Sequence, residues 1–429
     1  MLLVQNYLLT HSLADLYRDH GVKARVASGH LEKASLNYDQ IEAVDSNPIV
    51  QECRGLVLRT TDGSPLSQDG IVGETVILAL PFFRFFNLGQ GSAADVNLEC
   101  ADTALFEKLD GTLTIVYFDD IQGEWHVATR AVSEADLPLN GWDMTFRGLF
   151  EKALCLTLER SSSGSVPDSL ASWVARGEQT SFQWLGSVLD KGRTYMFELC
   201  TSMNQVVVQH TVDSITLIGC RETKTGKEFW PSDIAPDLGV PHVARHRIGN
   251  IAELTAFVQG RDPRAFEGIV ACQEVSPGVF NRVKIKSAQY MAYSRLKDAV
   301  ASPRNVMTLI LGEKLDDAFV VMTDDIKATS VKMQDAMRSV LKDFRTKYDE
   351  LVLRVAEEAP PMSVWGSKEH RKAFARLAGQ SGIWFDPAMM CYTGKVKDVH
   401  EYIESKRGVS GVWTDGFIDS VLALCKSVK

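Results

Sequence analysis

The sequence predicts an α+β domain with antiparallel sheets over residues 1–300, followed by an all-α domain over 301–429. Before residue 300, short runs rich in β-branched and aromatic residues are interleaved irregularly with helical stretches. This irregular order favours antiparallel sheets over repeated βαβ units. After the stretch ASPRN at 301–305, apolar residues recur every three or four positions, which is typical of helices.

The first domain contains several segments with the composition of strands, bounded by turn residues. The predicted strands are 55–59, 75–80, 112–118, 125–129, 194–199, 206–209, 214–218, 268–272 and 282–285. Helices are predicted at the amphipathic start of the chain and at 146–158, 180–190 and 250–259. Asn250 is the expected N-cap of the last of these helices.

The second domain is predicted to be built around one long helix. Its apolar positions lie on one side of the helix: Met333, Met337, Val340, Phe344, Tyr348, Leu351 and Val355. Shorter helices are predicted at 367–378, 397–406 and 415–427. The sequence contains no internal repeat.

Composition and cysteine usage restrict the class of protein. The 429 residues are 45% hydrophobic and 24% charged, which is ordinary for a soluble globular protein. No apolar run is long enough to span a membrane, and the start lacks a basic n-region, so we expect a cytoplasmic protein. The scattered cysteines form no C-x-x-C pair, which argues against zinc and fits reduced thiols.

The net charge of −9 argues at first against a nucleic-acid partner. The charge is uneven, however. Residues 301–429 contain 19 basic and 18 acidic residues, and the first 300 contain 27 and 37. The acidic excess therefore lies in the domain that would handle a metal nucleotide, and net charge neither supports nor excludes RNA.

Five short motifs occur in a fixed order: ECRGLVL at 52–58, EKLDGTL at 107–113, MFELC at 196–200, FEGIV at 266–270 and VKIKS at 283–287. Each is weak alone. In the second motif, Lys108 precedes Asp110 and Gly111, a common turn pair, so a hairpin with an exposed lysine is one alternative. The other alternative is a lysine nucleophile.

The chemistry of nucleotidyl transfer to lysine explains all five motifs together. An attacking amine must be neutral, and nearby cations or a metal ion lower the pKa of an amine. The same cations neutralise charge on the transferring phosphoryl group. Lys284 and Lys286 alternate along a strand and so point to one face. Glu198 and Glu267 lie at strand ends, where a carboxylate could hold a ribose hydroxyl or Mg²⁺.

With these motifs in order, the chain resembles the covalent nucleotidyltransferase superfamily. Within it, the chain is similar to the ATP-dependent, tRNA-repairing RNA ligases of T-even phages. The motifs that carry this resemblance are ECRG, FFNL at 85–88, KLDG, the Phe-Glu pair at 197–198, EGIV, and KIKS followed by Tyr290. The resemblance covers roughly residues 34 to 320 and implies an ATP-grasp-like ligase fold for the nucleotidyltransferase domain.

The resemblance also implies roles for individual residues. Lys108 would become adenylated, Asp110 and Glu198 would serve the ribose and the sealing step, and Arg54 would contact the triphosphate of ATP. Tyr290 would support ligation.

The phosphates and the metal would have their own residues. Lys284 and Lys286 would bind phosphates, and Glu267 would lie near the α-phosphate and its metal. The motif EKLDDAFV at 313–320 aligns with the acidic pair of the family, so Asp316 would be a ligand of Mg²⁺ or Mn²⁺.

Three positions depart from the family pattern. Arg84, which the resemblance implies is an ATP-binding residue, stands where the family has lysine, which keeps the charge but not the geometry. Leu36 stands where the family has an aromatic residue that stacks on adenine, so this position is either a nucleotide contact or a core residue. A lysine-rich motif is reduced to Arg130.

The implied function is joining of RNA 5′-phosphate and 3′-hydroxyl ends, in nicked tRNA above all, in the cytosol of a bacterial or phage-infected cell. A polynucleotide kinase/phosphatase would act upstream. DNA ligases and capping enzymes normally append a β-barrel with an R-x-D-K motif, which is missing here. A self-adenylating RNA-end sensor that does not seal stays an alternative. The helical domain would select the RNA through Lys368, Lys372 and Arg376, one stripe along a helix, or this stripe is a solvated face.

Overall fold

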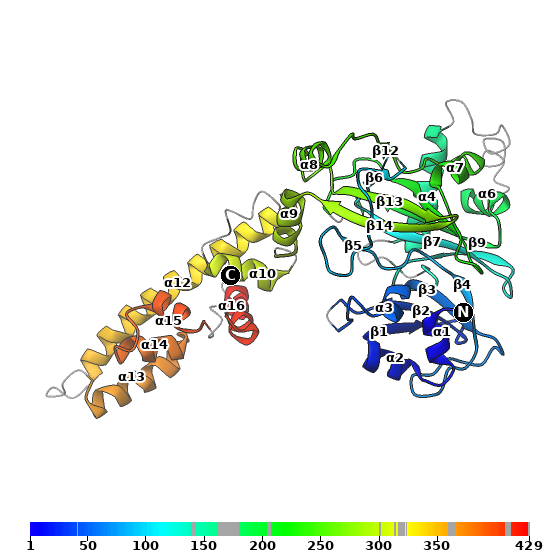
Figure 1. Cartoon of the computed structure of the whole chain (residues 1–429). Helices are drawn as coiled ribbons and strands as arrows, with labels where there is room; N and C mark the ends of the chain where they lie inside the picture. The colour runs from blue at the N-terminus through cyan, green and yellow to red at the C-terminus, as the bar shows by residue number, and fades with distance from the viewer. Residues whose placement is uncertain are drawn as a thin grey trace. The chain divides into compact units, whose positions relative to one another are not determined.

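The computed structural model describes residues 1–40, 42–100, 102–136, 138, 143–161, 180–203, 207–299, 302–312, 315, 322, 324–358, 366–407 and 413–427. The chain divides into two compact units, Met1–Met291 and Ala292–Lys429 (Figure 1). The first unit contains three sheets with helices, and all pairs of neighbouring strands but one are antiparallel within its described part. The predicted α+β class with antiparallel sheets is confirmed.

The N-terminal part of the first unit is a four-stranded antiparallel sheet with three short helices. Its strands follow the chain order β1 (Val22–Val26), β2 (Lys33–Tyr38), β3 (Arg54–Thr60) and β4 (Thr75–Ala79). Its helices are α1 (Leu3–Leu8), α2 (Leu13–His20) and α3 (Pro48–Glu52). The single helix predicted at the start of the chain is therefore two helices. The second begins at Ser12, whose side chain accepts a hydrogen bond from the Asp15 N–H.

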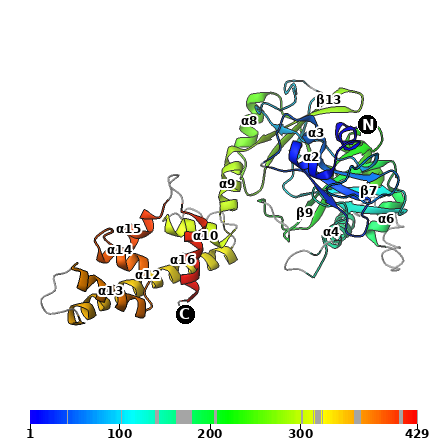
Figure 2. The ribbon, with the colours of Figure 1, turned by 90° about the horizontal axis from the view of Figure 1, so that it is seen from below.

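The second sheet forms the centre of the first unit. Its strand order is β11 (Glu228–Phe229), β10 (Ser214–Glu222), β9 (Arg193–Cys200), β7 (Thr112–Asp119) and β8 (Glu124–Ala128). One face packs against α4 (Phe146–Ser161), α6 (Ser181–Val188) and α7 (Pro231–Leu238), and α4 and α6 lie beside β9 and β7 in Figure 2. The opposite face packs against β3 and β4, so the sheet is covered on both sides.

The third sheet carries the strands of the KLDG, EGIV and KIKS motifs. Its order is β12 (Arg245–His246), β6 (Ala104–Lys108), β13 (Gly268–Ser276), β14 (Val279–Lys286) and β5 (Phe86–Asn87). Helix α8 (Ile251–Gln259) covers one face, where Leu254 and Val258 pack with Leu105, Ile269 and Val283. Because side chains alternate along a strand, Lys108, Lys284 and Lys286 point to the other face.

A buried ion-pair network fixes the four-stranded sheet against β7. The Lys33 ammonium on β2 is fully buried and lies 2.9 Å from Asp119 and 2.6 Å from Glu134. The Arg59 guanidinium on β3 donates to the other Asp119 oxygen at 2.9 Å. Removing one partner of a buried ion pair leaves an uncompensated charge, so separating β3 from β7 would be costly. The network therefore fixes the position of β3 and of Arg54, its first residue.

The second unit is built from helices in its described part, apart from an isolated bridge between Arg407 and Trp413. Its elements are the end of α9 (Ala288–Ala299), α10 (Pro303–Leu311), α12 (Asp324–Glu358), α13 (Lys368–Gln380), α14 (Phe385–Tyr392), α15 (Val399–Ser405) and α16 (Asp415–Ser427). The predicted apolar side of the long helix α12 is buried at Met337, Val340, Phe344, Leu351 and Val355. In neither unit does a described helix combine the length and the apolarity that crossing a membrane requires.

One predicted strand is wrong. Of 206–209, residue 206 lies outside the described residues, and 207–209 form no strand. The backbone N–H groups of Val207 and Val208 donate to the Asp110 carboxylate instead of to a neighbouring strand. A side chain that satisfies the backbone in this way removes the need for ladder hydrogen bonds.

Candidate active site

Lys108 lies at the end of β6, and Gly268 is its partner on the neighbouring strand β13. The ladder pairs Gly268 with Lys108 on one side and with Lys286 of β14 on the other. A Cβ atom at Gly268 would overlap the Ile285 carbonyl oxygen, so this position requires glycine. With no side chain between them, the two lysines reach one acid. Lys108 Nζ lies 2.6 Å from Glu267 Oε2, and Lys286 Nζ lies 2.7 Å from Glu267 Oε1.

The K-x-D-G motif is a crossover between sheets, not a hairpin. Lys108 ends a strand of the third sheet, and Thr112 begins β7 of the second sheet. A Cβ atom at Gly111 would overlap the Leu199 carbonyl oxygen of β9, which explains the glycine. The Gly111 N–H donates to Glu198 Oε1 at 3.0 Å. The crossover therefore brings Lys108 and Glu198 from different sheets to one place, and the hairpin alternative is excluded.

Asp110 is a buried anchor whose carboxylate is already occupied. One oxygen accepts the Val207 and Val208 N–H groups at 2.7 and 2.5 Å. The other oxygen accepts the Tyr290 hydroxyl at 2.8 Å, and Tyr290 is buried as well. His210 contacts the Asp110 carbonyl oxygen through Nε2 at 2.7 Å. Asp110 and Tyr290 therefore fix the loop that follows Lys108, and neither side chain faces open solvent.

The charged groups of Arg54 and Lys284 both lie over the ring of Phe85. The guanidinium carbon of Arg54 lies 5.6 Å from the ring centroid, and Lys284 Nζ lies 4.6 Å from it. Burial, followed by the charges of Arg54, Lys108 and Lys286, lowers the pKa of Lys284 to about 7. Burial and the charge of Arg130 lower the pKa of Arg54 to about 10. These positively charged side chains therefore repel one another, and the neighbouring carboxylates do not offset this repulsion.

The crowding indicates an anion site. Arg54 Nη1 is buried and has no hydrogen-bond partner among the described residues. A buried guanidinium N–H without a partner is costly, and an anionic oxygen would satisfy it. The charge of Arg130 acts on Arg54, so Arg130 adds to the positive potential at this place.

Two of the three positions that depart from the family pattern, Arg84 and Leu36, differ in their surroundings. The Arg84 guanidinium lies over the rings of Tyr38 and Phe86 at 4.1 and 5.1 Å and pairs with Asp45 at 2.5 Å. Leu36 is only 1% exposed and packs in the core of the four-stranded sheet. Of the two alternatives for Leu36, a nucleotide contact or a core residue, the structure favours the core residue. Its side chain offers no surface to a nucleotide.

Glu198 is a half-buried carboxylate on the site face of β9, because its neighbours Phe197 and Leu199 point into the core on the other face. Burial raises the pKa of Glu198 to about 7, while the Lys108 charge and the Gly111 N–H oppose this rise. A carboxylate with these properties near a lysine and a crowd of cations can accept hydroxyl hydrogen bonds or a metal ion.

This raised pKa predicts a pH-dependent effect on stability. The folded state binds a proton at Glu198 more tightly than the unfolded state, so the unfolding free energy falls as pH rises from about 4.5 to 7. Glu198→Gln, which keeps the Gly111 hydrogen bond, should raise Tm at pH 8. With allowance for solvent screening of a half-buried group, we expect about 1 kcal/mol, or about 2–4 °C. Calorimetry at pH 5 should show a smaller difference. An unchanged Tm at pH 8 would contradict the raised pKa.

Two carboxylates near Lys108, Glu198 and Glu267, are the candidate ligands for a divalent cation. Within the described residues, no group of three or more metal-binding side chains is found. Glu198 has no ion-pair partner in that part of the chain, which suits a cation, whereas Glu267 already bridges Lys108 and Lys286. Mg²⁺ is commonly held by one or two carboxylates with water and substrate phosphates, so this pair of acids is sufficient. Asp316, the predicted metal ligand, lies outside the described residues.

Sequence reasoning missed three contributors to this site. Gly268 lets two lysines share Glu267, and Phe85 supports both Arg54 and Lys284. Arg282 continues the row of Lys286 and Lys284 along β14, and its alternation with those two lysines was a signal that could have found it. Together these residues form a cationic surface around an amine and two carboxylates, an arrangement suited to attack of the amine on a phosphate ester.

Comparisons with known proteins found relatives of this chain. No family model matches the chain. The chain is 26% identical over 387 residues to a protein named RNA ligase from Rhodothermus phage RM378, covering 78% of this chain and 80% of that protein.

A second relative and a solved structure have weaker coverage or similarity. The chain is 26% identical over 348 residues to a putative bifunctional polynucleotide kinase/RNA ligase from Autographa californica nuclear polyhedrosis virus. That match covers 78% of this chain and 44% of that protein, so the chain spans less than half of it. An archaeal ATP-dependent RNA ligase structure has a TM-score of 0.41 at 14% identity, over 86% of each chain.

Proposed function

We propose that this protein is an ATP-dependent RNA ligase that joins a 5′-phosphate to a 3′-hydroxyl through a lysyl-AMP on Lys108. The observation that carries the proposal is the convergence of Lys108, Glu267, Lys286, Lys284 and Arg54 on one face of the third sheet. The relative named RNA ligase supports the choice of RNA as substrate.

The first step would form a bond between Lys108 Nζ and the α-phosphorus of ATP. The bond from that phosphorus to the β,γ-diphosphate breaks, and diphosphate leaves. Glu267 Oε2, at 2.6 Å, is in position to hold the proton that the ammonium must lose. Lys284, Lys286 and Arg54 would neutralise charge on the phosphates, and Arg54 Nη1 would gain the partner it lacks.

The second and third steps reuse the same cations. AMP passes from Lys108 to the RNA 5′-phosphate, breaking the N–P bond and forming a phosphoanhydride. The RNA 3′-hydroxyl then attacks the 5′-phosphorus and loses its proton to water, and AMP leaves with the electron pair of the broken P–O anhydride bond. A divalent cation held by Glu198 and Glu267 would supply further neutralisation of phosphate charge when bound.

Asp110 and Tyr290 would act as positioning residues. Since the Asp110 carboxylate is filled by Val207, Val208 and Tyr290, its contribution to the ribose and sealing steps would come through the loop that it holds. Glu198, with a free face toward the site, is the better contact for a ribose hydroxyl.

The experiment that tests this function uses α-labelled ATP with Mg²⁺, and then unlabelled RNA. The protein should first acquire acid-labile label. On addition of 5′-phosphorylated single-stranded RNA or nicked tRNA, the label should leave the protein and a joined strand should form. Joining of nicked duplex DNA instead would make the protein a DNA ligase. Self-labelling without any joined product would assign it to the RNA-end sensors.

The helical unit would select the RNA through exposed basic residues of α13. Lys368 and Lys372 are exposed, whereas Arg376 is paired with Glu358 at 2.6 Å. We therefore expect the Lys368→Ala/Lys372→Ala variant to bind tRNA about threefold more weakly at low salt, with a shallower salt dependence. Arg376→Ala is the matched control and should change binding less. Equal binding of the double variant and wild type across a salt series would leave the stripe as solvated surface.

A further inference from the structure

A cavity of about 660 Å³ lies in the first unit beside the candidate active site, and neither Lys108 nor Glu267 lines it. Its lining combines positive charge with aromatic rings. Four basic side chains face one acidic one: Arg84, Arg221, Lys224, Arg282 and Glu228. The phenylalanines are Phe82, Phe83, Phe85, Phe86 and Phe280. In a chain of net charge −9, this local positive excess requires an explanation.

The cavity continues the cation row of the active site. Arg282, Lys284 and Lys286 alternate on one face of β14, and Arg282 and Phe280 line the cavity. Since a strand rises about 3.4 Å per residue, Phe280 lies about 20 Å along β14 from Lys286. A ligand that starts at Lys108 and follows this row therefore enters the cavity.

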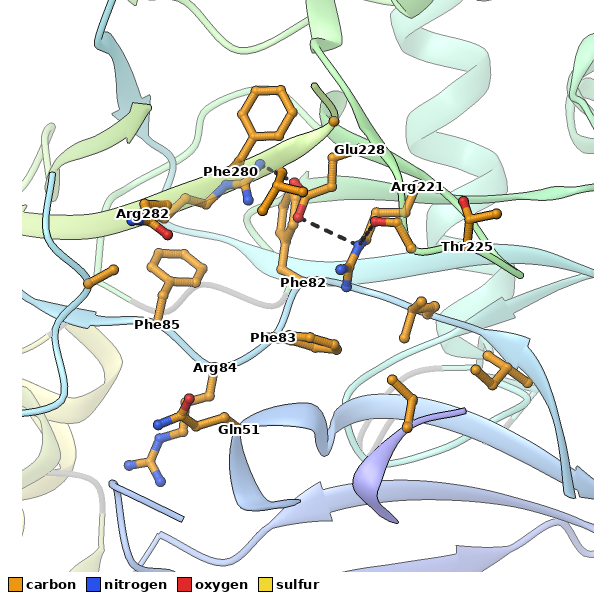
Figure 3. A pocket seen from close by; sticks show the side chains of 18 of the residues that line it. Gln51, Phe82, Phe83, Arg84, Phe85, Arg221, Thr225, Glu228, Phe280 and Arg282 are labelled. Atoms are coloured by element: carbon orange, nitrogen blue, oxygen red, sulfur yellow. Dashed lines mark hydrogen bonds and ion pairs between the residues drawn. The ribbon is translucent and has the colours of Figure 1, made fainter. Parts of the chain in front are cut away.

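Cations stacked on rings line the cavity (Figure 3). Arg282 lies over Phe82 at 4.2 Å, and Arg221 lies over Phe83 at 4.5 Å. Glu228 pairs with both guanidinium groups, one of them Arg221 Nε at 3.5 Å, and so fixes them. Figure 3 shows Phe83 and Phe85 between this group and Arg84.

Arg84 adds a free donor to the lining. Its Nη1 is buried and has no hydrogen-bond partner among the described residues. Phe83 is half-buried, so part of its ring is exposed, and Lys224 is exposed at the rim. A ligand with both negative charge and a flat ring, a nucleotide, matches these groups.

We propose that this cavity binds the single-stranded RNA substrate several nucleotides away from the end that reacts, with one base stacked against Phe83. The inference rests on the proposed ligase function. ATP that reacts at Lys108 has only three phosphates and no second base, so it cannot fill a cavity that extends about 20 Å from Lys286. An RNA strand has a phosphate and a base at every step, and base–aromatic stacking is tolerant of sequence.

The test compares a long and a short RNA. Binding of a 5′-phosphorylated octanucleotide and of a 5′-phosphorylated dinucleotide is measured by fluorescence anisotropy. Phe83→Leu should raise Kd for the octanucleotide about tenfold, because stacking of one base is lost, and leave the dinucleotide unchanged. Lys224→Glu should weaken octanucleotide binding and lower the slope of log Kd against log salt by about one to two.

Matched controls come from the same unit. Phe118 carries Lys191 over its ring at 4.3 Å, a cation–ring pair that does not line the cavity. Phe118→Leu and Lys191→Glu should leave Kd for both RNAs unchanged. All four variants should label with α-labelled ATP as wild type does, which shows that they are folded and that the first step is intact.

The outcomes separate the cavity from the function. If wild type labels normally but Phe83→Leu binds the octanucleotide like Phe118→Leu, the cavity proposal is overturned. Equal weakening for the dinucleotide would place Phe83 at the reacting end and overturn it too. A changed oligomeric state with unchanged RNA binding would assign the cavity to a protein contact. If octanucleotide binding responds as expected but the wild-type protein acquires no label from α-labelled ATP, the proposed ligase function fails, and the cavity remains an RNA-binding site.

Discussion

Lys108→Ala is expected to abolish covalent labelling of the protein by α-labelled ATP, a loss of more than about 10⁴-fold in rate. The amine at this position is the nucleophile of the proposed first step, and it lies 2.6 Å from Glu267, the acid in position to hold its proton. The measurement is acid-labile label on denatured protein after incubation with ATP and Mg²⁺.

Two further variants show that the loss comes from the nucleophile. Lys108→Arg keeps a cation beside Glu267 but should label no better than alanine, because a guanidinium stays protonated. Lys152→Ala removes a lysine that is also paired with an acid, Asp213 at 3.0 Å, and should label normally. Label of normal intensity on Lys108→Ala would refute the assignment of the covalent site.

Local patterns in the sequence predicted every strand of the second sheet except the two-residue β11, and also both strands that carry the EGIV and KIKS motifs. The β-branched run at 112–118 appears as β7 and the run at 194–199 as β9, since both are buried on two faces. The alternation of Lys284 and Lys286 correctly placed both on one face, because α8 covers the other. These features depend only on neighbours in sequence.

Features that depend on distant segments could not be predicted. Strand β6 is short and ends in the charged pair Glu107 and Lys108, so its composition favoured a turn, yet pairing with β13 makes it a strand. Phe85 lies between Arg54 and Lys284, which come from opposite ends of the first unit's sequence. Such contacts depend on how the sheets pack against one another, and the spacing of apolar residues along the sequence does not predict this packing.

Asp110 shows the limit of a motif most clearly. The K-x-D-G pattern and the resemblance together gave its carboxylate a direct role at the ribose. In the structure, Val207, Val208 and Tyr290 occupy both oxygens, because residues 207–209, which were predicted to belong to a strand, form a loop instead. A motif can thus identify a required residue without identifying what its side chain contacts.

Lys284→Met is expected to slow self-adenylation about 10²- to 10³-fold, the usual cost of removing one preorganised charge from a transition state. In the free protein, burial and three neighbouring cations lower the pKa of Lys284 to about 7, so at pH 8 roughly 90% of this amine is neutral. Bound phosphates favour the charged form. Binding of ATP at pH 8 must therefore draw a proton onto Lys284.

That proton can be measured. Calorimetric titration of α,β-methylene-ATP with Mg²⁺ at pH 8, in two buffers of different ionisation enthalpy, should show uptake of close to one proton per nucleotide. The uptake should vanish at pH 6, where Lys284 is already charged, and in Lys284→Met. Lys284→Arg should keep more of the adenylation rate than methionine but also take up no proton, since its guanidinium is charged throughout. Proton uptake in Lys284→Arg equal to wild type would show that another group near the phosphates titrates. Because a lysine that served only to pack on Phe85 would not change the proton balance, the result separates a phosphate contact from a structural role.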